Sequence, residues 1–178
     1  TERDMLHRVC QHFPKTVVLL NTGNIIDMRW VREFDPASVL YVWQGGQEGG
    51  NAVLDVLSGD VTPSGHLADT IAGDIADWPS TANFGSRTEN IQTEDIYVGY
   101  RYFETFAPEK VLYPFGFGLS YTTFAMQASA FSVQLPESVR VDVTVRNTGL
   151  RPGKEVVQIY GSAPQATLGK PVRTLLSF

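Results

Sequence analysis

Residues 37–59 read ASVLYVWQGGQEGGNAVLDVLSG and contain a strand, a glycine-rich turn and a helix in direct succession. The apolar run at 37–43 is typical of a strand covered on both faces, as in parallel sheets. After the turn, the apolar residues recur at helical spacing, and Gly59 follows where helix ends favour glycine. The stretch therefore predicts one unit of an α/β fold.

The alternation of helix and strand extends toward the N-terminus. Thr1 and Asp4 form a capping-box pattern ahead of an amphipathic helix that Pro14 ends. The run TVVLLN at 16–21 predicts a second buried strand, and a short amphipathic segment at 25–34 precedes the breaker Asp35-Pro36. This order predicts a layered α/β sandwich with a mostly parallel sheet.

Residues 60–93 show no sustained periodicity, which predicts a long wrapping arm that Trp78, Phe84 and Ile91 would anchor. The aromatic-rich stretch at 95–124 fits neither a strand nor a single helical stripe. Gly116 and Gly118 in this stretch indicate backbone bends or close approaches that a Cβ would block. We interpret it as an ordered strap between two domains.

After the strap, Val139, Val141, Val143 and Val145 alternate with polar residues, which predicts an antiparallel strand with one wet face. With 123–134 and 155–160, it predicts the opening strands of a fibronectin type III-like β-sandwich. The predicted domains are 1–124 and 125–178, the second being partial because such a sandwich needs roughly 100 residues. Its open strand edge would favour association with another chain, including a second copy.

Composition excludes several classes of partner. A net charge of −5 and a pI near 5.1 argue against nucleic acid and an anionic membrane surface. The single cysteine, Cys10, lies on an apolar helical face and is expected to be a buried thiol. His7, His12 and His66 lack metal-ligand spacing, so we expect surface or capping histidines, no metal and no cofactor. The absence of an Asn-x-Ser/Thr sequon favours a bacterial source and a cytoplasmic over a secreted protein.

The glycine-rich turn at 45–50 supplies the candidate binding residues, Gln47 and Glu48. They follow a parallel strand and open a helix, where ligands and anions bind in α/β sheets. In the alternative interpretation, Glu48 only complements the helix dipole. Carboxylates are numerous, but no pair stands out for acid–base chemistry; they are Asp60, Asp69, Asp74, Asp77, Glu94, Asp95, Glu104 and Glu109.

Four ordered motifs resemble glycoside hydrolase family 3, the β-glucosidase-type enzymes. They are WQGGQEGGNA at 43–52, DVLSGDVTPSGHL at 55–67, EDIYVGYRYF at 94–103 and YPFGFGLSY at 113–121. The strand at 16–23 is similar to an upstream strand of that family, and 141–160 resembles the start of its fibronectin type III-like domain. The run LADTIA at 67–72 departs from the Leu-Pro-x-Thr-Phe-Pro-like run of many members.

The resemblance implies a retaining, exo-acting β-glycosidase, most simply a β-glucosidase, that hydrolyses terminal β-linked sugars of β-glucosides or oligosaccharides. In that family the nucleophilic Asp lies on a (β/α)8 barrel and the acid/base Glu lies upstream of the strand matching 16–20. We therefore assign no catalytic residue here and expect an inactive piece that forms part of the active-site wall and braces the barrel. A rival hypothesis is a non-catalytic carbohydrate-binding or scaffolding module, since sugars stack on aromatic rings.

Overall fold

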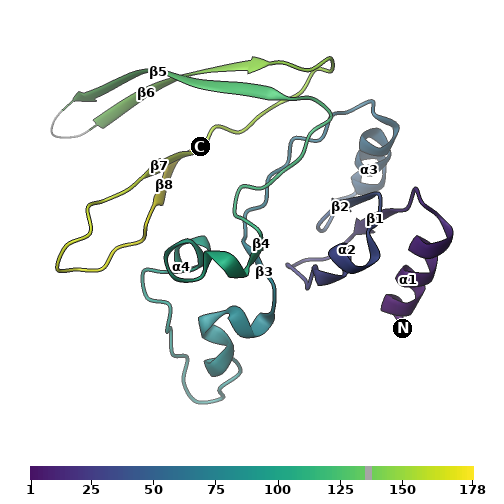
Figure 1. Cartoon of the computed structure of the whole chain (residues 1–178), viewed down its shortest axis with the longest axis horizontal. Coiled ribbons are helices and arrows are strands. Elements are labelled where there is room, and N and C mark those ends of the chain that lie inside the picture. Colours follow the sequence, from purple (N-terminus) through teal and green to yellow (C-terminus); the bar gives the residue numbers. More distant parts are fainter. Residues whose placement is uncertain (135–137) are drawn as a thin grey trace.

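A computed structural model describes residues 1–134 and 138–178, with helices and strands alternating first and strands alone at the end (Figure 1). The helices are α1 Glu2–His12, α2 Arg29–Phe34, α3 Gly49–Ser58 and α4 Tyr100–Phe106, with short 3-10 helices η1 Ile75–Asp77, η2 Pro79–Asn83 and η3 Pro108–Lys110. The strands are β1 Val17–Leu20, β2 Ser38–Tyr41, β3 Ile71–Ala72, β4 Val111–Tyr113, β5 Phe124–Gln134, β6 Ser138–Asn147, β7 Ile159–Gly161 and β8 Thr174–Ser177. The described strands pair as β1-β2, β3-β4, β5-β6 and β7-β8.

The N-terminal part has the predicted α/β order. Strands β1 and β2 pair in parallel, with Val17 opposite Ser38 and Leu20 opposite Tyr41. The predicted capping box at Thr1 and Asp4 is present. Helix α2 ends at the left-handed residue Asp35, and α3 ends at left-handed Gly59, as the breaker and glycine signals predict.

Strand β1 is not covered on both faces, contrary to the prediction from its apolar run, whereas the apolar residues of β2 are all partly buried. Val17 is 46% exposed and Leu19 is 44% exposed, whereas Val18 and Leu20 pack against the core. Cys10 is likewise a partly exposed free thiol and not a buried one, because α1 has no buried residue. An apolar run indicates a preference for burial, and in β1 only the side with Val18 and Leu20 packs against the core.

Two small clusters of buried side chains form the core. The first gathers Met28, Trp30 and Ile71 with aliphatic residues of β1 and β2. The second gathers Ala72, Phe103 and Ala107. Because Ile71 and Ala72 are the two residues of β3, this short strand joins the clusters, and its antiparallel partner β4 continues the strap.

The aromatic stretch contains a helix that the sequence analysis missed. Helix α4 starts after Gly99, whose φ of 63° is left-handed, and it buries Phe103 completely. Tyr102 and Phe106 also pack edge-on or tilted around this helix. With seven residues, α4 makes about two turns. That length is too short for an apolar stripe to emerge from residues that are aromatic on several sides.

The strap glycines behave as predicted. Gly116 has a left-handed φ of 80°, and a Cβ there would clash with the Gln158 amide oxygen. A Cβ on Gly118 would lie 2.5 Å from the Gly65 carbonyl oxygen and 2.9 Å from the His66 ring. The strap thus contacts the α/β part on one side and the C-terminal part on the other.

The long arm has one of its three predicted anchors. Trp78 packs edge-on against Phe103 with ring centroids 4.8 Å apart. Phe84 is 91% exposed and Ile91 is 51% exposed, so the prediction that they anchor the arm is wrong. Spacing along an irregular segment indicates which residues could anchor it, but not which side of the segment faces the core.

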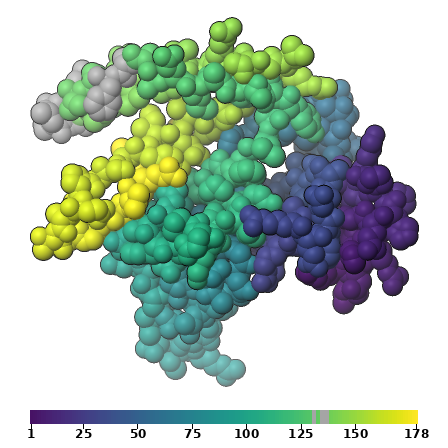
Figure 2. All heavy atoms as spheres, viewed as in Figure 1, coloured from purple at the N-terminus to yellow at the C-terminus, as the bar shows by residue number. Residues whose placement is uncertain are grey.

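Two hairpins form the C-terminal part and project from the rest of the molecule, as the space-filling view shows (Figure 2). The first pairs β5 with β6, in agreement with the alternating valines. The predicted strand at 155–160 is shorter and later than expected, because β7 comprises only Ile159–Gly161 and pairs with β8. The described hairpins share no strand-to-strand pairing with each other.

Candidate functional site

The carboxyl ends of β1 and β2 lie side by side and lead into two polar turns. The Tyr41 hydroxyl donates a 2.5 Å hydrogen bond to the Asn24 carbonyl, which also accepts from the Thr22 hydroxyl. The Gln44 amide packs on Gly23, where a Cβ would lie 2.7 Å from Nε2. The turn after β1 is therefore fixed against the turn after β2 at the sheet edge where α/β proteins bind ligands.

Gln47 and Glu48 lie in the second turn and are both exposed. Glu48 is the N-cap residue of α3, but its carboxylate does not cap the helix backbone. It instead accepts a 2.5 Å hydrogen bond from the Asn51 side-chain amide. The structure thus places both predicted residues, exposed to solvent, at the N-terminus of α3.

Trp43, which the sequence analysis did not single out, is the unusual residue of this edge. Its φ of 59° is left-handed, a conformation that costs a bulky L-residue roughly 1–2 kcal/mol. Its ring packs against Tyr41 at a centroid distance of 4.4 Å. Backbone strain of this kind has no local sequence signal, because Trp43 reads as the last apolar residue of the strand.

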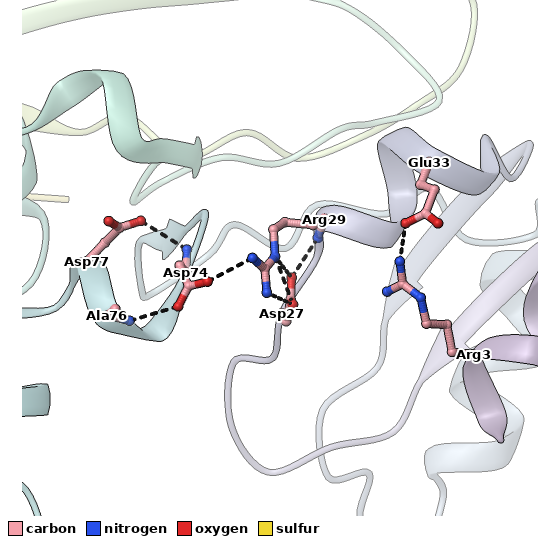
Figure 3. A network of polar contacts seen from close by, with 7 residues as sticks. All are labelled: Arg3, Asp27, Arg29, Glu33, Asp74, Ala76 and Asp77. Carbon is pink, nitrogen blue, oxygen red and sulfur yellow. Dashed lines mark hydrogen bonds and ion pairs between the residues drawn. The ribbon is translucent and has the colours of Figure 1, made fainter.

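The carboxylates of the arm and the α2 entrance form an ion-pair network (Figure 3). Arg29 binds Asp27 at 2.6 Å and reaches Asp74 at 2.8 Å. The hydrogen bond from Arg29 lowers the pKa of Asp27, and the same contact raises the pKa of Arg29. Asp74 and Asp77 also form the capping box of η1. The network links α2 to the arm. Its carboxylates already have hydrogen-bond or ion-pair partners within the network.

Other carboxylates have structural partners as well. Asp77 pairs with Lys110 at 2.8 Å, which lowers the pKa of Asp77 and raises that of Lys110. Glu104 accepts two hydrogen bonds from Arg173. An acid–base pair for glycoside hydrolysis needs two carboxyl groups facing a bond to be broken. Asp74, Asp77 and Glu104 instead each face a cation.

The histidines behave in two ways. His7 stacks on Phe34, and His12 contacts the Arg8 carbonyl, so both are the exposed residues that we expected. His66 differs, because its half-buried ring pairs with Glu155 at 2.9 Å.

Within residues 1–134 and 138–178, no three His, Cys, Asp or Glu side chains gather as a metal site. None of the helices in that range has the length and apolar character that a membrane span needs.

Comparisons with known proteins identify the family. A family model described as the glycosyl hydrolase family 3 C-terminal domain matches residues 1–121. A β-glucosidase of Ruminococcus albus is 51% identical over 177 residues, which are 99% of this chain and 18% of the relative. β-Glucosidase A of Butyrivibrio fibrisolvens is 47% identical over 192 residues, covering 98% of this chain and 23% of the relative.

Solved structures of similar proteins agree with this family assignment. The β-glucosidase from Paenibacillus barengoltzii superposes with a TM-score of 0.93 at 54% identity, covering 98% of this chain and 20% of that one. The β-glucosidase from Kluyveromyces marxianus in complex with glucose gives a TM-score of 0.92 at 38% identity, covering 99% and 21%. The chain spans about a fifth of the length of these relatives. The residues, the fold and the matched family model lead to one conclusion: this chain belongs to glycosyl hydrolase family 3, and residues 1–121 match its C-terminal domain.

Proposed function

We propose that this chain works as part of a retaining, exo-acting β-glucosidase that removes terminal β-linked sugars from β-glucosides or oligosaccharides. In that enzyme it forms part of the active-site wall and braces a (β/α)8 barrel that carries the nucleophile. The relatives named β-glucosidases support this function, since the match covers almost the entire chain. Glucose is bound in the Kluyveromyces marxianus relative.

The bracing role is supported by the large accessible surface. The chain exposes 12,936 Å², whereas a compact monomer of 19.7 kDa exposes about 8,600 Å². Large apolar side chains are exposed along the whole chain, and several of them belong to the N-terminal layer. Single exposed apolar residues are ordinary, but a contiguous apolar face marks an interaction surface.

The helices beside β1 and β2 carry the exposed apolar side chains that would form such a face. Met5 of α1 is 61% exposed, Phe13 just after α1 is 64% exposed, and Leu54 of α3 is 63% exposed. Neither helix buries a residue completely, although both have the amphipathic pattern of packed helices. We assign this face to the contact with the rest of the enzyme.

We also propose that residues 125–178 are the beginning of a fibronectin type III-like domain and that 1–124 belong to the α/β sandwich. Two antiparallel hairpins and the valine alternation of β6 support that assignment. We further propose that the open hairpin edges pair with other strands, in the same enzyme or in a second copy.

The rival function, a carbohydrate-binding or scaffolding module, rests on the density of aromatic residues. Most rings of the strap pack against one another, which reduces that support. Tyr100 contacts Phe115 at 4.8 Å, and Tyr113 contacts Phe117 at 5.2 Å. The mutual packing of these rings weakens the case for an aromatic sugar platform in the strap, and the match to β-glucosidases favours the enzyme.

Replacement of the matching segment in the Ruminococcus albus β-glucosidase by this chain tests the proposal. We expect the chimera to hydrolyse an aryl β-glucoside, while the isolated 178-residue chain shows no activity above a heat-killed blank. Gln47→Ala and Glu48→Ala in the chimera should raise KM if these residues bind substrate, and Asp55→Asn on the same helix serves as the control. Activity of the isolated chain would overturn the proposal, and so would a folded but inactive chimera.

A further inference from the structure

Trp43 lies at the point where the chain leaves β2 and enters the glycine-rich turn. The Val42 N–H donates to the Leu20 carbonyl at 2.9 Å, so strand pairing continues up to the residue before Trp43. At Trp43 the backbone takes a left-handed φ of 59°, which is unfavourable for an L-residue with a bulky side chain. Residues held in such strained conformations cluster at functional sites. A strained residue at the sheet edge where α/β proteins bind ligands therefore indicates a functional role.

The Trp43 ring is held by the strand that precedes it. The ring centroids of Tyr41 and Trp43 lie 4.4 Å apart, with the planes tilted by 40°. Aromatic contacts of this kind stabilise beyond the area that they bury. The Tyr41 hydroxyl in turn donates to the Asn24 carbonyl at 2.5 Å. Through Tyr41, the Trp43 ring is thus connected to the turn that follows β1.

The backbone after the strained residue has a second contact across the same edge. A Cβ on Gly23 would lie 2.7 Å from Gln44 Nε2, so the Gln44 amide lies directly against the turn after β1. Residues 44–48 are all exposed, and they include the candidate binding residues Gln47 and Glu48. The left-handed backbone, the stacked ring and the Gln44 contact together fix where this exposed turn begins.

We propose that Trp43 is a positioning residue of the proposed β-glucosidase. Its left-handed backbone and its ring on Tyr41 hold the turn 44–48 in the place from which Gln47 and Glu48 contact the sugar. This role rests on the proposed function and on substrate binding by the turn. Because Trp43 acts through the turn and not on the reacting atoms, its loss should weaken substrate binding and leave the chemical step unchanged. That combination raises KM at constant kcat.

Steady-state kinetics of the Ruminococcus albus chimera with an aryl β-glucoside test this role. Trp43→Gly removes the ring, and glycine adopts the left-handed conformation without strain. We expect KM to rise about threefold to tenfold, with kcat within about twofold of the wild type. Trp43→Phe keeps an aromatic ring for Tyr41 and should restore KM to within about twofold of the wild type. A purely structural role would lower the fraction of folded enzyme, and hence kcat, without changing KM.

A double-mutant cycle shows whether Trp43 acts through the turn. The turn variant Gln47→Ala/Glu48→Ala should raise KM on its own, and adding Trp43→Gly to it should raise KM by less than about twofold more. Asp35→Gly is the matched control, because Asp35 is also left-handed, with a φ of 47°, but ends helix α2. It should leave KM unchanged with and without the turn variant.

Each outcome separates this role from the proposed function. An inactive wild-type chimera would overturn the proposed function, and the role of Trp43 with it. In an active chimera, the role alone is overturned by an unchanged KM of Trp43→Gly, by additive effects in the cycle, or by a turn variant with normal KM. Trp43→Phe as impaired as Trp43→Gly would overturn it too.

A second substitution guards against misfolding of the glycine variant. Trp43→Asn also removes the ring, and asparagine tolerates a left-handed backbone better than other side chains do. Thermal unfolding of the chimeras shows which variants are folded, and KM is then measured on those. Loss of folding in both Trp43→Gly and Trp43→Asn, with Asp35→Gly folded, would assign Trp43 a structural role and overturn the proposal.

Discussion

Arg173 binds Glu104 through two hydrogen bonds and thereby fixes the last hairpin on the strap helix α4. Nε lies 2.6 Å from one carboxylate oxygen and Nη2 lies 2.5 Å from the other. The guanidinium also lies 4.8 Å from the centre of the Tyr160 ring. These contacts raise the pKa of Arg173, chiefly through the Glu104 hydrogen bonds. Through this pair, the strap connects the α/β part to the C-terminal β part.

Arg173→Lys should loosen this hairpin, because an ammonium cannot reproduce the two-pronged contact. Glu104 is 18% exposed and Arg173 is 48% exposed, so screening limits the loss to about 0.5–1.5 kcal/mol. Urea unfolding measures it, and the exposed residue Arg146 provides the control Arg146→Lys. Equal effects of the two substitutions would show that the ion pair adds nothing to stability.

Phe103→Ala should destabilise the chain by about 3–5 kcal/mol, since it empties a fully buried site between α4, the arm and β3. Phe106 lies on the same helix and is 57% exposed, so Phe106→Ala should cost far less. Thermal unfolding of both variants gives the comparison. A small loss for Phe103→Ala would mean that the arm collapses into the cavity or that α4 does not hold the core.

Most of the N-terminal fold could be predicted because its signals are local. The capping box at Thr1, the left-handed ends at Asp35 and Gly59 and the apolar runs of both strands all act within a few residues. Helix α4 shows the limit of such signals, because the sequence predicted an irregular strap there and the structure has a helix. The helix depends on burial of Phe103, which packs against Trp78 and β3.

Contacts between distant residues could not be predicted in the same way. Nothing beside Glu104 indicates Arg173, and nothing beside His66 indicates Glu155, because each pair exists only once the strap has brought two parts together. The position of Gln47 and Glu48 at the start of α3 could be predicted from the sequence, and their binding role stays a prediction. The left-handed Trp43 beside them was missed, since φ has no local signal for a strand-like residue.

Acid should remove stability through Asp77. Its pairing with Lys110 lowers its pKa in the folded state, so the ionised group stabilises the fold above the unfolded pKa of about 3.9. That contribution is lost as the pH falls through the folded pKa. Asp77→Asn should therefore be less stable than the wild type at neutral pH and lose less stability between neutral and acidic pH. Acid titration of the unfolding midpoint tests this, with the helix-surface variant Asp55→Asn as control.

Gly118→Ala should break the close approach between the strap and the segment after α3. Its Cβ would lie 2.5 Å from the Gly65 carbonyl oxygen, so the backbone must shift. We expect a loss of about 1–3 kcal/mol in unfolding free energy. At Gly46 nothing lies within 4 Å of an added Cβ, so Gly46→Ala is the matched control. Equal stability of the two variants would show that the strap is free to move at this point.

Two buried threonines should respond oppositely to the same substitution. Thr70 is 2% exposed, and its hydroxyl oxygen has no hydrogen-bond partner among the described residues. Thr122 is 7% exposed, and its hydroxyl donates a 2.8 Å hydrogen bond to Asn147 Oδ1. An unsatisfied buried hydroxyl costs its desolvation, whereas a paired one repays that cost.

Thr70→Val should therefore stabilise the chain by about 1 kcal/mol, because valine has the same shape and no group to desolvate. Thr122→Val should destabilise it by about 1 kcal/mol, since the link between the end of the strap and β6 is lost. Urea unfolding of both variants under one condition makes the comparison direct. Destabilisation by Thr70→Val of the same size as Thr122→Val would show that the Thr70 hydroxyl has a partner in solution, and the stabilising prediction would then be wrong.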